Sequence, residues 1–280
     1  MFFLSHSCDP TNLKNLKTVK KFLLPLSFLL PFAAFFIFSS FNSKENLKAT
    51  VIISKEKNKI AALTTASKSL VKDNDDADNA TIEAEANKLY EDLDLEALGM
   101  SKAALRYAYK GVQTLERKGK LPNPDILTVC DFSQSSSRKR MYIIDLRNKE
   151  VLLNTYVAHG RNSGLQYAER FSNAAQSLES SLGFYVTRST YYGGHGLSLR
   201  LDGLEPGFNS NALSRAIVVH GAVYIGDNRV GAPYMGRSWG CPAVPQSLAP
   251  KVINLIKNGT CLFIYHPSQK YLDQSRILNS

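Results

Sequence analysis

The stretch RSWGCPAV, residues 237–244, places Cys241 between a glycine and a proline, in a kink and not in a core strand. A thiol is a nucleophile only as the thiolate, and an unperturbed cysteine, with a pKa of about 8.5, is mostly protonated at neutral pH. A nucleophilic Cys241 therefore requires a basic or cationic neighbour, and histidine is the usual one. Cys130 and Cys261 lie in strand-like runs, where they are either buried thiols or a disulfide pair.

Three of the five histidines, His159, His195 and His220, are each followed by a glycine. His220 ends the apolar run AIVV, so we expect it to emerge at the end of a buried strand. The chain that follows contains GDNRVGAPYMGRS, which is rich in glycine and polar residues and can fold back to bring Cys241 close. A lone histidine is commonly a structural residue. Here a cysteine in a Gly-Pro turn follows the strand, and the pattern indicates a catalytic His–Cys pair as strongly as it indicates a structural histidine.

The surrounding motifs resemble those of a known family. His220 and Gly221, a loop and then SWGC, residues 238–241, are similar to the active-site motif of the YkuD-type L,D-transpeptidases, in which a histidine and a loop precede [ST]-H-G-C. The chain resembles more specifically the murein L,D-transpeptidase catalytic domain family, through the stretches DFSQSS, VAHGRNSG, SSLGFY, HGLSLRLDGLEPGFN, RAIVVHGAVYI and GRSWGCPAVP. This resemblance covers about residues 95–266.

The resemblance implies a cysteine acyltransferase that needs no metal and no cofactor. Cys241 would be the nucleophile and His220 its base, with the Gly221 carbonyl orienting the imidazole. The N–H groups near Gly240 and Cys241 would form the oxyanion hole. The thiolate would attack a peptidoglycan stem tetrapeptide between diaminopimelate and D-alanine. D-Alanine would leave, and an amine of a neighbouring stem would take the acyl group, giving a 3-3 crosslink. Covalent inhibition by carbapenem-type compounds would follow.

The motif departs from the wider family at two positions. Trp239 stands where the second histidine of [ST]-H-G-C is usual, and we expect its ring to form a wall of the substrate groove. Ala243 stands where arginine or asparagine is common. Another cation would then supply the missing charge, namely Arg237, Arg161 or Arg229. The candidate substrate-binding residues are Ser238, Trp239, Arg237, His159, Arg161, Ser163 and His195.

The sequence leaves three alternatives open. With water in place of the amine acceptor, the protein would be an L,D-carboxypeptidase. Zinc bound by His159, His195, His220 and Cys241 would make it a metallopeptidase or a structural zinc protein, but these residues lack the short spacings of zinc motifs. A non-catalytic cell-wall-binding module would keep the groove without turnover.

The N-terminus predicts export. Lysines at positions 14, 17, 20 and 21 precede FLLPLSFLLPFAAFFIFSSF, residues 22–41, which carries no charge and is long enough to cross a bilayer. Because no clean A-x-A site follows, we expect residues 1–41 to be an uncleaved signal anchor in the inner membrane, with a cleaved signal peptide as the alternative. The catalytic part would then lie in the periplasm or cell envelope. The net charge of +10 suits an acidic wall polymer, and no nucleic-acid-binding motif is present.

The rest of the chain predicts a mainly β catalytic domain with a few short helices. We interpret residues 42–94 as a polar, partly disordered linker, residues 95–268 as the domain and residues 269–280 as a tail. Apolar residues at helical spacing predict a helical lead-in over 101–118, and a second helix within 245–259. Short apolar runs predict strands in ILTVCDF, RMYIIDL, VLLNTYVAH, SLGFYVTR, RAIVVHGAVYI and TCLFIYH. Together with the resemblance, this pattern predicts a YkuD-like β-sandwich or barrel.

Overall fold

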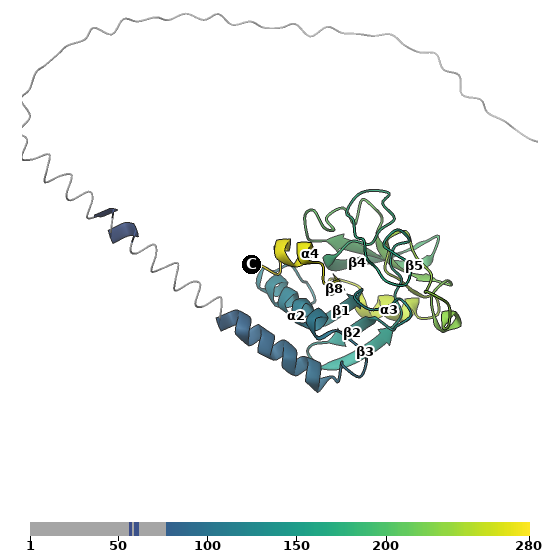
Figure 1. Ribbon diagram of the computed structural model, residues 1–280, viewed down its shortest axis with the longest axis horizontal. Coiled ribbons are helices and arrows are strands. Elements are labelled where there is room, and N and C mark those ends of the chain that lie inside the picture. The colour runs from purple at the N-terminus through teal and green to yellow at the C-terminus, as the bar shows by residue number, and fades with distance from the viewer. Residues whose placement is uncertain (1–55, 58, 62–76) are drawn as a thin grey trace, which may run out of the picture. The chain divides into compact units, whose positions relative to one another are not determined.

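The structure, a computed structural model, describes residues 56–57, 59–61 and 77–280 (Figure 1). The predicted signal anchor, residues 1–41, lies outside the described residues. Within the described part of the chain, no helix combines the length and the apolar character that crossing a membrane requires.

One eight-stranded sheet dominates residues 77–280. Its order is β3-β2-β1-β8-β4-β5-β6-β7. The pairs β1–β8 and β6–β7 are parallel, and the other neighbours are antiparallel. The strands are β1 (Ile126–Asp131), β2 (Met141–Asp145), β3 (Glu150–Thr155), β4 (Gly183–Gly193), β5 (Gly196–Gly203), β6 (Val218–Ala222), β7 (Ala243–Pro245) and β8 (Cys261–Tyr265).

The two ends of the sheet meet. Just beyond β3, the Ala158 N–H donates to the carbonyl oxygen of Ala243 in β7, with an N···O distance of 2.8 Å. Gly160 forms a further bridge to Ser238, just before β7. The sheet is therefore nearly closed, and the expectation of a mainly β domain with a few helices is confirmed. Closure also holds the chain on either side of Cys241 against the chain that follows β3.

Helix α2 (Lys102–Arg117) packs on β1 and β8, as Figure 1 shows. It begins as predicted after Ser101, whose side chain accepts a hydrogen bond from the Ala104 N–H. The helix lies so close to the sheet that a Cβ added to Gly111 would be 2.0 Å from Cζ of Phe184 in β4. Glycine is therefore required at that contact. The other helices are α3 (Ala249–Ile256), α4 (Gln269–Gln274), the 3-10 helix η1 (Asp227–Arg229) and a helix over residues 77–92.

Segments at both ends of the domain contribute to its core. Leu89 and Tyr90, in the helix over residues 77–92, belong to the same buried cluster as the sheet residues. At the other end, the segment interpreted from the sequence as a tail contains α4. The Tyr271 hydroxyl of α4 donates to Oε2 of the buried Glu205 at 2.8 Å, and the same oxygen accepts the Phe184 N–H of β4 at 2.9 Å.

Cys130 and Cys261 are both free, buried thiols. The β1–β8 register places Cys130 opposite Ile264 and Cys261 opposite Leu127, so the two cysteines do not face each other. Burial raises the pKa of the Cys130 thiol to about 12. Neither cysteine is therefore suited to nucleophilic chemistry.

Candidate active site

Cys241 and His220 line one cavity of about 480 Å³. His220 lies in β6, and the chain then returns through η1 and a loop to Cys241, just before β7. The parallel β6–β7 pairing places His220 opposite Ala243, two positions beyond the cysteine. The other residues that line the cavity are Tyr191, His195, Arg215, Ala216, Ile217, Val218, Tyr224, Arg237, Ser238 and Trp239.

The His220 imidazole is oriented by its own backbone. Its Nδ1 lies 2.9 Å from the Gly221 carbonyl oxygen, the contact expected from the sequence. Because a carbonyl can only accept, Nδ1 carries the proton and Nε2 keeps a free lone pair. Burial lowers the pKa of His220, with the Gly221 carbonyl opposing this shift and His195 adding to it. His220 is therefore a neutral imidazole with an available base nitrogen.

The Cys241 thiol rests in its neutral form. Its Sγ donates to the Ala216 carbonyl oxygen at 3.6 Å. Burial raises the pKa of the thiol, while the Val218 backbone N–H and the Arg215 guanidinium oppose this rise. A raised thiol pKa beside a lowered imidazole pKa favours the uncharged pair over a thiolate–imidazolium pair.

Ser238 holds the turn that carries the nucleophile. Its Oγ donates to the Cys241 carbonyl oxygen at 2.6 Å and accepts the Gly240 N–H at 3.1 Å. Gly240 has φ of +121°, and a Cβ there would lie 2.7 Å from the Glu179 carbonyl oxygen, so both conformation and space require glycine. Since Ser238 occupies the Gly240 N–H, that group is not a free oxyanion donor. The Cys241 N–H has no hydrogen-bond partner within residues 77–280.

Arg215, which the sequence analysis did not single out, places a cation beside the nucleophile. Its guanidinium lines the cavity, and Nη2 would be 3.4 Å from a Cβ on Gly240. Its Nη1 donates to the Ser172 carbonyl oxygen at 2.7 Å, and its Nη2 donates to that of Glu179 at 2.8 Å. Arg215 precedes the AIVV run, and no motif distinguishes it from other surface arginines.

The structure brings some of the predicted substrate-binding residues to the cavity. Trp239 stands at its rim with 73% of its surface exposed. Arg237 also lines it, with Nη1 donating to the Arg161 carbonyl oxygen at 2.8 Å and the guanidinium over the Tyr234 ring. His195 lines it from the β4–β5 hairpin, and Ser238 is buried in its wall.

Three other predicted residues do not line the cavity. His159 is fully buried, with Nδ1 accepting from Arg140 Nη2 at 2.7 Å and Nε2 donating to the Gly164 carbonyl oxygen at 3.3 Å. Burial, with the nearby Arg140 charge adding to it, lowers the pKa of His159 to about 3, so its ring is a neutral structural group. Ser163 is buried and accepts the Ser180 N–H, whereas Arg161 is exposed outside the cavity.

The zinc alternative has no geometric support. It requires His159 to join His195, His220 and Cys241, but His159 lies in the core with both nitrogens occupied. Within the residues that the structure describes, no three His, Cys, Asp or Glu side chains come together as metal ligands would. Arg229, a further candidate for the missing charge, lies in η1 and does not line the cavity either.

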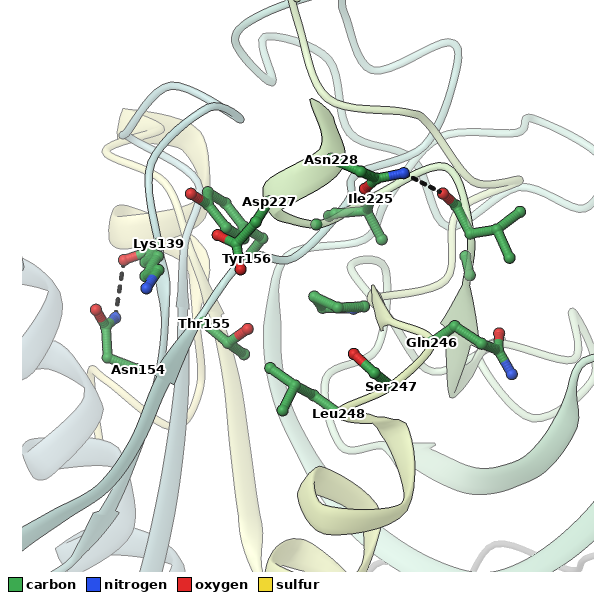
Figure 2. Close-up of a pocket in the computed structure, with 14 residues that line it drawn as sticks. Lys139, Asn154, Thr155, Tyr156, Ile225, Asp227, Asn228, Gln246, Ser247 and Leu248 are labelled. Atoms are coloured by element: carbon green, nitrogen blue, oxygen red, sulfur yellow. Dashed lines mark hydrogen bonds between the residues drawn. The ribbon is translucent and has the colours of Figure 1, made fainter. Parts of the chain in front are cut away.

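A second cavity of about 480 Å³ lies beyond the ends of β6 and β7, as Figure 2 shows. Lys139, Asp227 and the amides of Asn154, Asn228 and Gln246 line it, but no cysteine or histidine does. The Asn154 amide is already engaged by the Lys139 carbonyl oxygen, at 2.8 Å. Unlike the cavity of Cys241 and His220, this second cavity is lined by no cysteine and no histidine.

Comparison with solved structures finds L,D-transpeptidases of low identity. One from Mycobacterium smegmatis is 13% identical over 51% of this chain and 59% of its own, with a TM-score of 0.32. L,D-transpeptidase 3 from Mycobacterium tuberculosis, in complex with a faropenem-derived adduct, is 12% identical over 51% and 60%, with a TM-score of 0.33. Bd1075 from Bdellovibrio bacteriovorus is 13% identical over 50% and 48%, with a TM-score of 0.31. This chain thus spans between 48% and 60% of the length of these three proteins.

No curated protein matches the chain. The model of the L,D-transpeptidase catalytic domain family, by contrast, matches residues 96–265, which is more than half of the chain. This match includes α2, the whole sheet and the strands that position Cys241 and His220. The chain therefore belongs to the L,D-transpeptidase catalytic domain family.

Proposed function

We propose that the protein is a peptidoglycan L,D-transpeptidase with Cys241 as its nucleophile. The observation that carries this proposal is that Cys241 and His220 share one cavity, while Nδ1 of His220 is held on the Gly221 carbonyl. That bond leaves Nε2 as the one nitrogen of His220 able to accept the thiol proton. The net charge of +10 suits a wall polymer that is rich in carboxylates.

The first half-reaction transfers an acyl group to sulfur. Nε2 of His220 takes the Sγ proton as the sulfur attacks the carbonyl carbon between diaminopimelate and the terminal D-alanine. The unpartnered Cys241 N–H donates to the oxyanion that forms. The tetrahedral intermediate then collapses, His220 returns the proton to the departing D-alanine nitrogen, and a thioester remains on Cys241.

The second half-reaction releases the enzyme. A side-chain amine of a neighbouring stem attacks the thioester and gives its proton to His220, and the sulfur leaves and is reprotonated. Trp239 and Arg237, at the cavity wall, would contact the stem peptides. Arg215, beside Gly240, contributes positive charge that favours the attacking sulfur anion.

Turnover of a purified disaccharide tetrapeptide tests the proposal. We expect crosslinked dimers and free D-alanine from the wild-type protein and neither product from Cys241→Ala or His220→Ala. Lys139→Ala, in the second cavity, is the control and should leave turnover unchanged, since it touches neither residue. Tripeptide without dimers would identify an L,D-carboxypeptidase. Wild-type protein that binds wall but makes no product and no carbapenem adduct on Cys241 would overturn the enzymatic proposal.

We also propose that the domain acts outside the cytoplasmic membrane, exported by residues 1–41, because its substrate lies there. A reporter enzyme that works only outside the cytoplasm should be active when it is fused after residue 280. Activity of a reporter that works only in the cytoplasm would contradict this proposal.

A further inference from the structure

The β4–β5 hairpin carries a second histidine to the catalytic one. Gly193 pairs with Gly196, so Gly194 and His195 form the turn of the hairpin. In β5, Ser198 pairs with His220 of β6, which brings the start of β5 alongside the catalytic histidine. His195 therefore reaches the cavity from an element that the Cys241 and His220 motifs do not include.

The two imidazoles stack. Their ring centroids are 4.2 Å apart and their planes differ by 22°. This is a near-parallel, stacked arrangement of the two rings. The His220 ring is thus restrained in two ways, because the Gly221 carbonyl holds Nδ1 in the plane of the ring and His195 covers one of its faces.

We propose that His195 is a positioning residue, whose ring restrains the His220 imidazole by stacking so that Nε2 stays directed at the cavity of Cys241. The proposal rests on the proposed function of Cys241 and His220. Rotation of the His220 ring about its Cβ–Cγ bond would break the Nδ1 contact and turn Nε2 away, and the stacked ring opposes that rotation.

Alkylation of Cys241 by iodoacetamide tests this role without any wall substrate. The rate is measured in the full-length protein by mass spectrometry, which distinguishes alkylation of Cys241 from alkylation of the other cysteines. We expect His195→Ala to slow alkylation about 2- to 10-fold, the range that the loss of one aromatic stacking contact predicts. His195→Phe restores a flat ring and should recover most of the rate.

The controls separate this proposal from the proposed function. Tyr192→Ala, at an 83% exposed position of the same hairpin, should alkylate at the wild-type rate. The positioning role would be overturned if Cys241 were alkylated at the wild-type rate in His195→Ala. It would also be overturned if alkylation were as slow in His195→Phe as in His195→Ala. If His220→Ala alkylates at the wild-type rate, the Cys241–His220 pair is not catalytic and the proposed function fails as well. Thermal unfolding of each variant shows whether a slower rate reflects lost structure.

Discussion

Replacing Ser238 by alanine tests whether one hydroxyl holds the nucleophile's turn. The change removes the hydrogen bond to the Cys241 carbonyl oxygen at 2.6 Å and the one from the Gly240 N–H at 3.1 Å. Gly240 is buried, so its orphaned N–H costs about 1–3 kcal/mol. Cys241 is only half-buried, so the loss of the hydrogen bond to its carbonyl costs about 0.5–1.5 kcal/mol.

The sum predicts that Ser238→Ala lowers the free energy of unfolding by about 1.5–4.5 kcal/mol. For a domain of this size, that corresponds to a fall in Tm of roughly 3–18 °C. Thermal unfolding followed by circular dichroism measures the shift, and dimer formation from tetrapeptide measures its effect on the site. Ser238→Thr keeps the hydroxyl and should recover stability and turnover relative to alanine. A Tm for Ser238→Ala within about 1 °C of wild type would refute the reasoning.

Three further predictions follow from packing, burial and exposure. Gly111→Ala should destabilise the protein by about 1–3 kcal/mol in urea denaturation, since its Cβ would overlap the Phe184 ring; unchanged stability would mean that α2 can move away. Stability should fall as the pH drops from about 6.5 towards 3, because the unfolded chain binds a proton that buried His159 excludes. His159→Asn should flatten that part of the pH profile, and an identical profile would exclude His159 as the source. Trp239→Ala should leave Tm unchanged, because the ring is 73% exposed, but raise KM for tetrapeptide; an unchanged KM would remove Trp239 from the substrate groove.

The sequence predicts the strands that have apolar runs and misses those that do not. All six runs contain a strand, and α2 buries the apolar residues whose spacing predicted it. Strand β5 was not predicted because Gly196–Gly203 has no continuous apolar run, although its leucines alternate with polar residues as in a half-buried strand. Strand β7 escapes because Ala243–Pro245 is short and contains a proline, so that tertiary pairing with β6 and Ala158 defines it.

Some features of the candidate site could likewise be predicted from the sequence, and others depend on tertiary structure. The pairing of Cys241 with His220 was expected from one continuous segment, in which a strand end precedes a Gly-Pro turn. The Gly221 contact was expected from the family resemblance. The His195 stack depends on the register of the β4–β5 hairpin, which shifts between Thr187 and Thr190. No local pattern carries that register. His159 resembles a site residue in the sequence because polar residues and glycine surround it. In the structure, Arg140, just before β2, contacts it in the core.

The parallel pairing of β1 with β8 has a consequence for how the chain reaches its native state. These strands lie side by side in the middle of the sheet, but one starts at Ile126 and the other ends at Tyr265. The chain must therefore be synthesised through Tyr265 before the centre of the sheet can be assembled, and contacts this distant in sequence slow folding. A stop codon immediately before Cys261 would remove the strand between β1 and β4 and leave both of those strands with an unpaired edge in the middle of the sheet.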